Sequence, residues 1–255
     1  MLVTILRKKK LVHGNKKHIE KVHIFFQVYN VICSNSNMGY TVLRKFALRR
    51  INAVIFDMDG TLCLPQPWMF PAMREAIGLR DTSKDILEFI DEMEDPQSQI
   101  DAENGLKMVE KKAMDDMVPQ PGLTEIMGYL TKSKISKNIC TRNVGGPVEY
   151  LINKFIPEDY SKFDHIVTRD FRPAKPFPDP LLHIAQQVET EPESVIMVGD
   201  SFDDMKSGRS AGCLTVLLKG TANDKVVANH KDLIDFIIND LRELIEIIEE
   251  INAQT

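Results

Sequence analysis

The chain has 255 residues and is poor in cysteine, and its first fifty residues are poor in acidic side chains. Its four cysteines are scattered and form no Cys-x-x-Cys pair, which argues against a disulfide framework and against a zinc site. Residues 1–50 hold eleven lysines and arginines and one acidic residue, a balance of +10, whereas residues 51–255 hold 21 against 36, a balance of −15. The acidic body offers no basic face, so we expect no nucleic-acid partner.

The basic segment also lacks an apolar run long enough to cross a membrane. Its most apolar stretch, residues 22–33, is too short and contains His23, Gln27 and Asn30, so we expect no membrane partner. We interpret residues 1–50 as an N-terminal extension that is disordered or targeting. Two interpretations stay open. The segment is a mitochondrial presequence, or the protein is cytoplasmic and residues 1–37 are either an artefact upstream of a true start at Met38 or a disordered tail.

The main functional signal is the sequence Asp-Met-Asp-Gly-Thr at residues 57–61. The apolar run before it, residues 51–56, is rich in β-branched and aromatic residues and predicts a buried strand that ends in a sharp turn. Asp57 and Asp59 then lie at the carboxyl end of a strand, where open α/β sheets bind ligands. Two such carboxylates suit phosphoryl transfer, because one can attack phosphorus while the other handles the leaving-group proton.

Further polar residues follow two other predicted strands, residues 135–140 and 194–198, and one precedes a predicted helix. Because the carboxyl ends of parallel strands meet at one edge of a sheet, we expect these side chains to converge with the first two aspartates. The residues are Thr141, Arg142 and Asn143 after one strand, Asp200 and Asp204 after the other, and Lys175 in the sequence Lys-Pro-Phe-Pro-Asp-Pro.

In these motifs the chain resembles the haloacid dehalogenase-like hydrolase superfamily, and within it the phosphoglycolate-phosphatase-like phosphatases. The motifs stand in the family's order, and the resemblance covers about residues 51–218. It implies a hydrolase of phosphate monoesters that acts on a small phosphorylated metabolite. The dehalogenases that name the superfamily lack an acid–base aspartate two residues after the nucleophile, so Asp59 favours phosphate chemistry.

The order of elements predicts an α/β fold with a doubly wound parallel sheet, because strands alternate with helices from residue 121 onward. Helical, acidic segments near residues 69–79, 83–93 and 100–117 interrupt this order, where the resembling family has a helical cap. We therefore divide the chain into the extension 1–50, an α/β catalytic core of residues 51–64 and 119–255, and a cap of residues 65–118. Trp68, the sole tryptophan, either contacts substrate or fixes the cap.

The resemblance also implies a role for each motif residue. Asp57 would form an aspartyl-phosphate, and Asp59 would protonate the leaving group and then activate water. Thr141 would donate a hydrogen bond to the phosphoryl group, and Lys175 would neutralise its charge. The expected substrate-binding residues are Gly60, Thr61, Arg142 and Asn143, with the backbone N–H groups of Gly60 and Arg142 assisting Thr141.

A cation is also expected, because clustered aspartates would otherwise repel each other and the substrate. Oxygen ligands beside a phosphate select Mg²⁺. By resemblance, Asp57 and Asp200 would supply carboxylate oxygens and Asp59 its backbone carbonyl. Asp204 is included in the metal site, more as an orienter of water or of Lys175 than as a direct ligand.

Two questions stay open at the level of sequence. Arg142 either binds a second anionic group of the substrate or caps the following helix. The function itself has two rivals: a sugar-phosphate mutase of the β-phosphoglucomutase type, and a non-catalytic regulatory protein on the same fold. The intact set of motif residues argues against the second rival, since a binding protein needs no general acid.

Overall fold

The computed structural model describes residues 40–42, 49–220 and 223–255. Most of the predicted extension, including Met38 and the greater part of the candidate presequence, lies outside these ranges. Within them, no helix combines the length and the apolar character that a bilayer crossing requires.

One sheet of seven strands forms the centre of the molecule, in the order β1-β7-β6-β5-β2-β3-β4. From β2 the chain moves outward through β3 to β4, then returns to β5 on the other side of β2 and continues through β6 to β7. All neighbours in this series pair in parallel, which confirms the predicted doubly wound α/β fold. The strands are β1 Thr41–Val42, β2 Ala53–Phe56, β3 Ser136–Cys140, β4 His165–Val167, β5 Val195–Gly199, β6 Leu214–Leu218 and β7 Phe236–Ile238.

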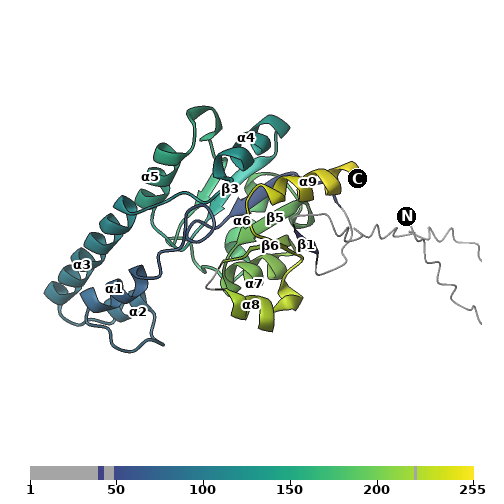
Figure 1. Cartoon of the computed structure of the whole chain (residues 1–255). Helices are drawn as coiled ribbons and strands as arrows, with labels where there is room; N and C mark the ends of the chain where they lie inside the picture. Colours follow the sequence, from purple (N-terminus) through teal and green to yellow (C-terminus); the bar gives the residue numbers. More distant parts are fainter. Residues whose placement is uncertain (1–39, 43–48, 221–222) are drawn as a thin grey trace, which may run out of the picture.

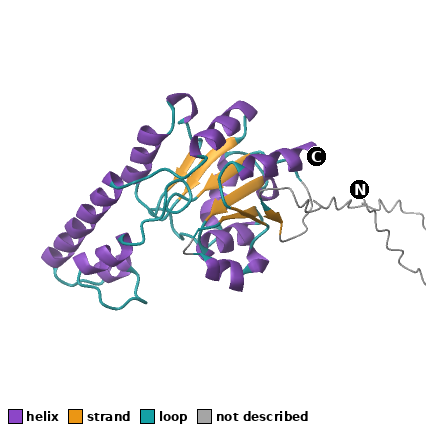
Figure 2. Cartoon of the chain, in the orientation of Figure 1, coloured by secondary structure: helices purple, strands orange, loops and turns teal. Residues whose placement is uncertain are grey.

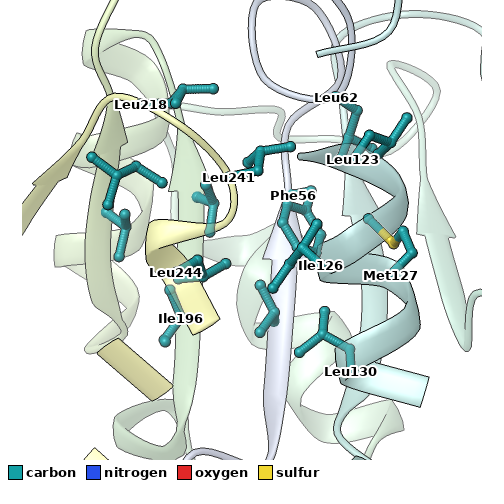
Figure 3. Close-up of a cluster of buried hydrophobic side chains, with 14 of the residues drawn as sticks. Phe56, Leu62, Leu123, Ile126, Met127, Leu130, Ile196, Leu218, Leu241 and Leu244 are labelled. Carbon is teal, nitrogen blue, oxygen red and sulfur yellow. The ribbon is translucent and has the colours of Figure 1, made fainter. Parts of the chain in front are cut away.

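Helices cover both faces of the sheet, so the central strands β2, β5 and β6 are buried along their whole length. On one face, Phe56 of β2 packs in a cluster with Ile126 and Leu244 (Figure 3). This face carries α4 Leu123–Ser133, α5 Gly145–Phe155 and α9 Glu243–Ala253. The other carries α6 Asp179–Gln187, α7 Phe202–Ala211 and α8 Asp224–Asn229. Short 3₁₀ helices occupy Glu158–Tyr160, Pro192–Ser194 and Lys231–Leu233.

Of the four helices between β2 and β3, the first three lie apart from the sheet (Figures 1 and 2): α1 Met69–Ala76, α2 Ile86–Asp91 and α3 Pro96–Asp115. They share a hydrophobic cluster of their own, against which Trp68 packs, and the Lys112 ammonium lies 5.0 Å from the Trp68 ring. These contacts favour the interpretation that Trp68 fixes the cap. The helix α3 begins earlier than predicted, because Asp95 caps it and Pro96 occupies the first turn, where its missing N–H is not needed.

Two chain segments connect these helices to the sheet, and they run side by side. The Leu64 N–H donates to the Val118 carbonyl at 2.8 Å, and the Gln120 N–H donates to the Leu62 carbonyl at 3.0 Å. The paired segments begin close to Asp59, so any movement of the three helices relative to the sheet starts beside this residue.

An additional strand extends the sheet beyond the sequence-based prediction. β1 lies within the segment assigned to the extension, yet it pairs antiparallel with β7. Tyr40 just before it is buried, its ring lies 5.9 Å from the Phe236 ring, and its hydroxyl donates to Glu250. Residues 40–42 therefore pack with the core, although the predicted domain boundary at residue 50 assigned them to the extension.

Candidate active site

The first two aspartates lie where the order of the sheet reverses, between β2 and its neighbours β3 and β5. The Asp57 N–H donates to the Val198 carbonyl of β5 at 2.9 Å, which continues the β2–β5 pairing up to the site. Gly60 then turns the chain with φ of 85°. A Cβ atom at Gly60 would lie 2.1 Å from Asp200 Oδ2, so the turn and the close approach both require glycine.

The Lys175 side chain forms hydrogen bonds with groups at the ends of β2 and β3 and in α7. Its Nζ atom donates to Asp57 Oδ1 at 2.7 Å, to Asp204 Oδ1 at 2.6 Å and to the Cys140 carbonyl at 2.7 Å. Burial by itself lowers the pKa of Lys175, but Asp204 and Asp57 together raise it above its ordinary value. The lysine therefore stays charged, and it is not the solvated surface cation that an isolated lysine usually is.

Asp204 has both carboxylate oxygens engaged by other protein groups. Besides Lys175 on Oδ1, Ser201 donates to Oδ2 through its backbone N–H at 3.1 Å and its hydroxyl. The Ser201 hydroxyl in turn accepts from the Asp204 N–H, which forms a capping box at the start of α7. These contacts suit the expected role of Asp204, the orientation of Lys175.

A cation fits this cluster on grounds of charge. Asp57, Asp200 and Asp204 can each place one carboxylate oxygen within 4.8 Å of the others. Burial and the charge of Asp204 raise the pKa of Asp200 to about 7. Lys175 alone does not balance three carboxylates, and a hard cation with oxygen ligands would remove the repulsion.

Asp59 is held apart from that cluster. Its Oδ2 atom accepts from the Asn143 side-chain amide at 3.0 Å, and the Asn143 N–H donates to Thr141 Oγ1 at 3.0 Å. Burial raises the pKa of Asp59 above its ordinary value. The two aspartates of one turn thus have different partners, and Asn143, which is expected to bind substrate, donates to Asp59.

Three other expected binding groups have the following contacts within the protein, and their role in binding substrate stays a prediction. The Gly60 N–H donates to the Cys63 carbonyl at 3.0 Å, so the turn itself uses this donor. The Thr61 side chain is fully buried, and its hydroxyl has no hydrogen-bond partner among the described residues. The Arg142 guanidinium pairs with two carboxylates, Asp203 in α7 and Asp85 before α2, both at 3.1 Å. It does not cap α5.

The site also contains residues that the sequence motifs do not indicate. Asn223 donates to the Asp200 carbonyl and to the Leu218 carbonyl, both at 2.9 Å, and so fixes the loop that carries Asp200. Its place soon after a predicted strand is a weak signal that could have pointed to it. Glu110 of α3 lines a cavity beside Asp59, and nothing in its helical surroundings distinguishes it from the other acidic residues there.

Comparison with known proteins agrees with this architecture. The haloacid dehalogenase-like hydrolase family matches residues 51–212. An uncharacterized hydrolase of Saccharomyces cerevisiae is 61% identical over 208 residues, which cover 82% of this chain and 95% of the yeast protein. The pyrophosphatase PpaX of Bacillus mycoides is 26% identical over 218 residues, which cover 80% of this chain and all of that protein.

Solved structures show the same fold at low sequence identity. A predicted phosphoglycolate phosphatase of Haemophilus somnus aligns with a TM-score of 0.61 at 17% identity, over 77% of this chain and 97% of its own. A β-phosphoglucomutase of Clostridium difficile aligns with a TM-score of 0.62 at 17% identity, over 80% of this chain and 98% of its own. From the family match and the yeast relative, the chain belongs to the haloacid dehalogenase-like hydrolases.

Proposed function

We propose that the protein is a Mg²⁺-dependent phosphatase that hydrolyses a small phosphorylated metabolite through an aspartyl-phosphate on Asp57. The observation that carries this proposal is the separation of the two aspartates that follow β2. Asp57 lies in the buried cluster with Lys175 and Asp200, whereas Asp59 is bound to Asn143 outside that cluster. One carboxylate is thus prepared for attack and the other for proton transfer.

In the first half-reaction, an oxygen of Asp57 attacks phosphorus and the bond to the leaving oxygen breaks. Lys175 holds Asp57 Oδ1, which orients the carboxylate and leaves Oδ2 without a hydrogen bond from the described residues. Asp59 gives its proton to the leaving oxygen, and its raised pKa keeps that proton available at higher pH than for an ordinary aspartate.

In the second half-reaction, Asp59 takes a proton from water, the water oxygen attacks phosphorus, and the bond to Asp57 breaks. Thr141 lies at the end of β3 and supplies a hydroxyl close to Asn143 for a phosphoryl oxygen. Mg²⁺, held by Asp57, Asp200 and the Asp59 carbonyl, would supply positive charge to the phosphoryl oxygens. Lys175 and Asp204 keep these groups aligned through both steps.

The test is phosphate release by the full chain from a panel of phosphorylated metabolites and from p-nitrophenyl phosphate. We expect activity with Mg²⁺, loss of activity with EDTA, and inhibition by Ca²⁺, whose higher coordination number favours bidentate Asp57. Asp57→Asn should abolish turnover while the fold is kept, because an amide is a poor nucleophile of nearly the same shape. A mutase would instead interconvert sugar phosphates with little net release of phosphate.

Substantial turnover by Asp57→Asn, or full activity after EDTA and dialysis, would contradict the proposed mechanism. Absence of phosphate release from every ester in the panel, in a protein that is folded by circular dichroism, would favour the non-catalytic interpretation.

A further inference from the structure

A small cavity lies between the cap and the sheet, directly beside Asp59. Asn143 and Asp59 line it from the core, and Gln66, Met114 and Glu110 line it from the cap side. Its volume is about 10 Å³, which gives room for about one water molecule. A leaving group that receives a proton from Asp59 reaches it through this space, so the side chains that line the cavity have to rearrange when a substrate enters.

The charged side chains that line this cavity are all acidic. Its lining contains two acidic residues, Asp59 and Glu110, and no lysine, arginine or histidine among the described residues. The Glu110 Oε1 atom lies 3.2 Å from a guanidinium nitrogen of Arg169, which follows β4 and is not part of the lining. The ion pair therefore fixes the position of the Glu110 carboxylate, while its cationic partner does not line the cavity.

A carboxylate held in this way discriminates between leaving groups. Its second oxygen has no hydrogen-bond partner among the described residues, and the side chain is 13% exposed. A hydroxyl or ammonium group would satisfy this acceptor, whereas a leaving group without a donor leaves it buried and unpaired. An anionic leaving group meets like charge in a space with room for about one water molecule, and juxtaposed like charges disfavour binding.

We propose that Glu110 sets the substrate class: the enzyme takes phosphate monoesters of neutral or cationic alcohols and rejects those with an anionic leaving group. This inference rests on the proposed phosphatase function and narrows it. Pyrophosphate releases phosphate, and phosphoglycolate releases a carboxylate, so both belong to the rejected class. A mutase reaction would also place a second phosphate near Glu110, because transfer of the phosphoryl group to a sugar phosphate forms a bisphosphate.

The experiment measures kcat/KM of the full chain with Mg²⁺ for four kinds of substrate. Glycerol phosphate has a neutral polyol leaving group and phosphorylethanolamine a cationic one. Phosphoglycolate and pyrophosphate have anionic ones, and p-nitrophenyl phosphate serves as the reference. We expect kcat/KM for the first two to exceed that for phosphoglycolate and pyrophosphate by about tenfold or more.

Glu110→Gln should lower kcat/KM for glycerol phosphate about tenfold and raise it for phosphoglycolate. Glu103→Gln is the matched control, since Glu103 is an exposed residue of the same helix that pairs with Lys107 within the cap. Arg169→Gln keeps the Glu110 charge and removes the cation that offsets it, so it should strengthen the rejection of anions. If the pair merely holds the cap closed, both variants will change all substrates alike.

A wild-type preference for phosphoglycolate or pyrophosphate would overturn the inference while leaving the phosphatase function in place. An equal loss on all substrates in Glu110→Gln and Arg169→Gln would overturn it as well. Absence of phosphate release from every substrate, p-nitrophenyl phosphate included, would instead overturn the proposed function and the inference together.

Discussion

Two aspartates one residue apart have different surroundings in this protein, and the difference follows from the turn between them. Gly60 bends the chain directly after Asp59, and the turn is closed by hydrogen bonds to the Met58 carbonyl. Asp57 stays in line with β2 and contacts Lys175, whereas Asp59 reaches Asn143 after β3. A single tight turn thus separates the proposed nucleophile from the proposed acid–base.

Asp59→Asn should slow both half-reactions, because the same carboxyl group gives and then takes the proton. The first step should suffer less with p-nitrophenyl phosphate, whose leaving group needs little protonation. The aspartyl-phosphate should then accumulate, which intact mass after an acid quench would detect. Equal slowing of aryl and alkyl esters without a trapped intermediate would make Asp59 a structural residue.

The pH dependence gives an independent readout of Asp59. A general acid acts in its protonated form, and burial raises the pKa of Asp59. In wild-type protein, kcat/KM for an alkyl ester should therefore fall as the pH rises through this raised pKa, and the fall for p-nitrophenyl phosphate should be weaker. Parallel pH profiles for the two esters would contradict the acid role.

Gly60→Ala should reduce stability and activity together. The left-handed φ of 85° costs a non-glycine residue roughly 1–2 kcal/mol, and the new methyl group would also displace the Asp200 carboxylate, 2.1 Å away. Gly145→Ala is the control, since no atom lies within 4 Å of its added Cβ and its φ is not positive. Urea unfolding and phosphate release check both variants, and a wild-type-like Gly60→Ala would refute the close approach.

At the scale of elements, the cap and the core are joined by more than their two linking segments. Arg142 pairs with Asp85 of the cap, and Arg169 pairs with Glu110 of α3. Both arginines follow strands of the sheet, so the ion pairs cross the boundary at the open end of the site. Separation of the cap from the core has to break them.

Arg142→Gln should alter cap closure more than overall stability. The Arg142 side chain is 54% exposed, and exposed ion pairs contribute about 0–1 kcal/mol, so the free energy of unfolding should change little. KM for a good substrate should nevertheless change, and its dependence on salt should weaken, because one screened interaction across the boundary is lost. KM at low and high salt measures this effect.

Lys107→Gln is the matched control for that measurement, because Lys107 pairs with Glu103 inside the cap and forms no ion pair with the described residues of the core. It removes the same charge from the protein. If Lys107→Gln and Arg142→Gln change the salt dependence of KM equally, the effect reflects net charge and the ion pair across the boundary plays no part in closure.

At the scale of the whole molecule, the sheet is closed at one edge by a segment that precedes every motif. β1 pairs with β7, and Tyr40 contacts both Phe236 and Glu250. The Ile51 N–H also donates to the Asn252 side chain at 2.7 Å, so the entry to β2 is joined to α9. The sequence near residue 40 and the last helix therefore stabilise each other.

Two truncated chains test this arrangement. A chain that begins at Met38 keeps Tyr40 and β1 and should retain full activity, since every motif lies after it. A chain that begins at residue 49 loses both and should be less stable by about 2–3 kcal/mol, the value of burying one large side chain. Urea unfolding compares them, and equal midpoints would show that β1 contributes nothing.

The sequence by itself determined the fold class, the order of the elements and the family. Apolar runs such as residues 51–56 and 214–218 carry their own signal, because a strand covered by helices on both faces must be apolar throughout. Lys175 and the aspartates after β2 and β5 could be predicted because residues at strand ends converge in a parallel sheet. These features depend on local pattern and on chain order.

Only the tertiary structure decided which partner each polar group has. Asn143 reaches Asp59, Arg142 reaches Asp85 and Asp203, and Glu110 reaches Arg169, each across at least 57 residues of sequence. β1 was missed because two residues are too few for a periodic signal, and its partner β7 lies near the other end of the chain. Such contacts depend on where the cap and the sheet meet, which no local pattern specifies.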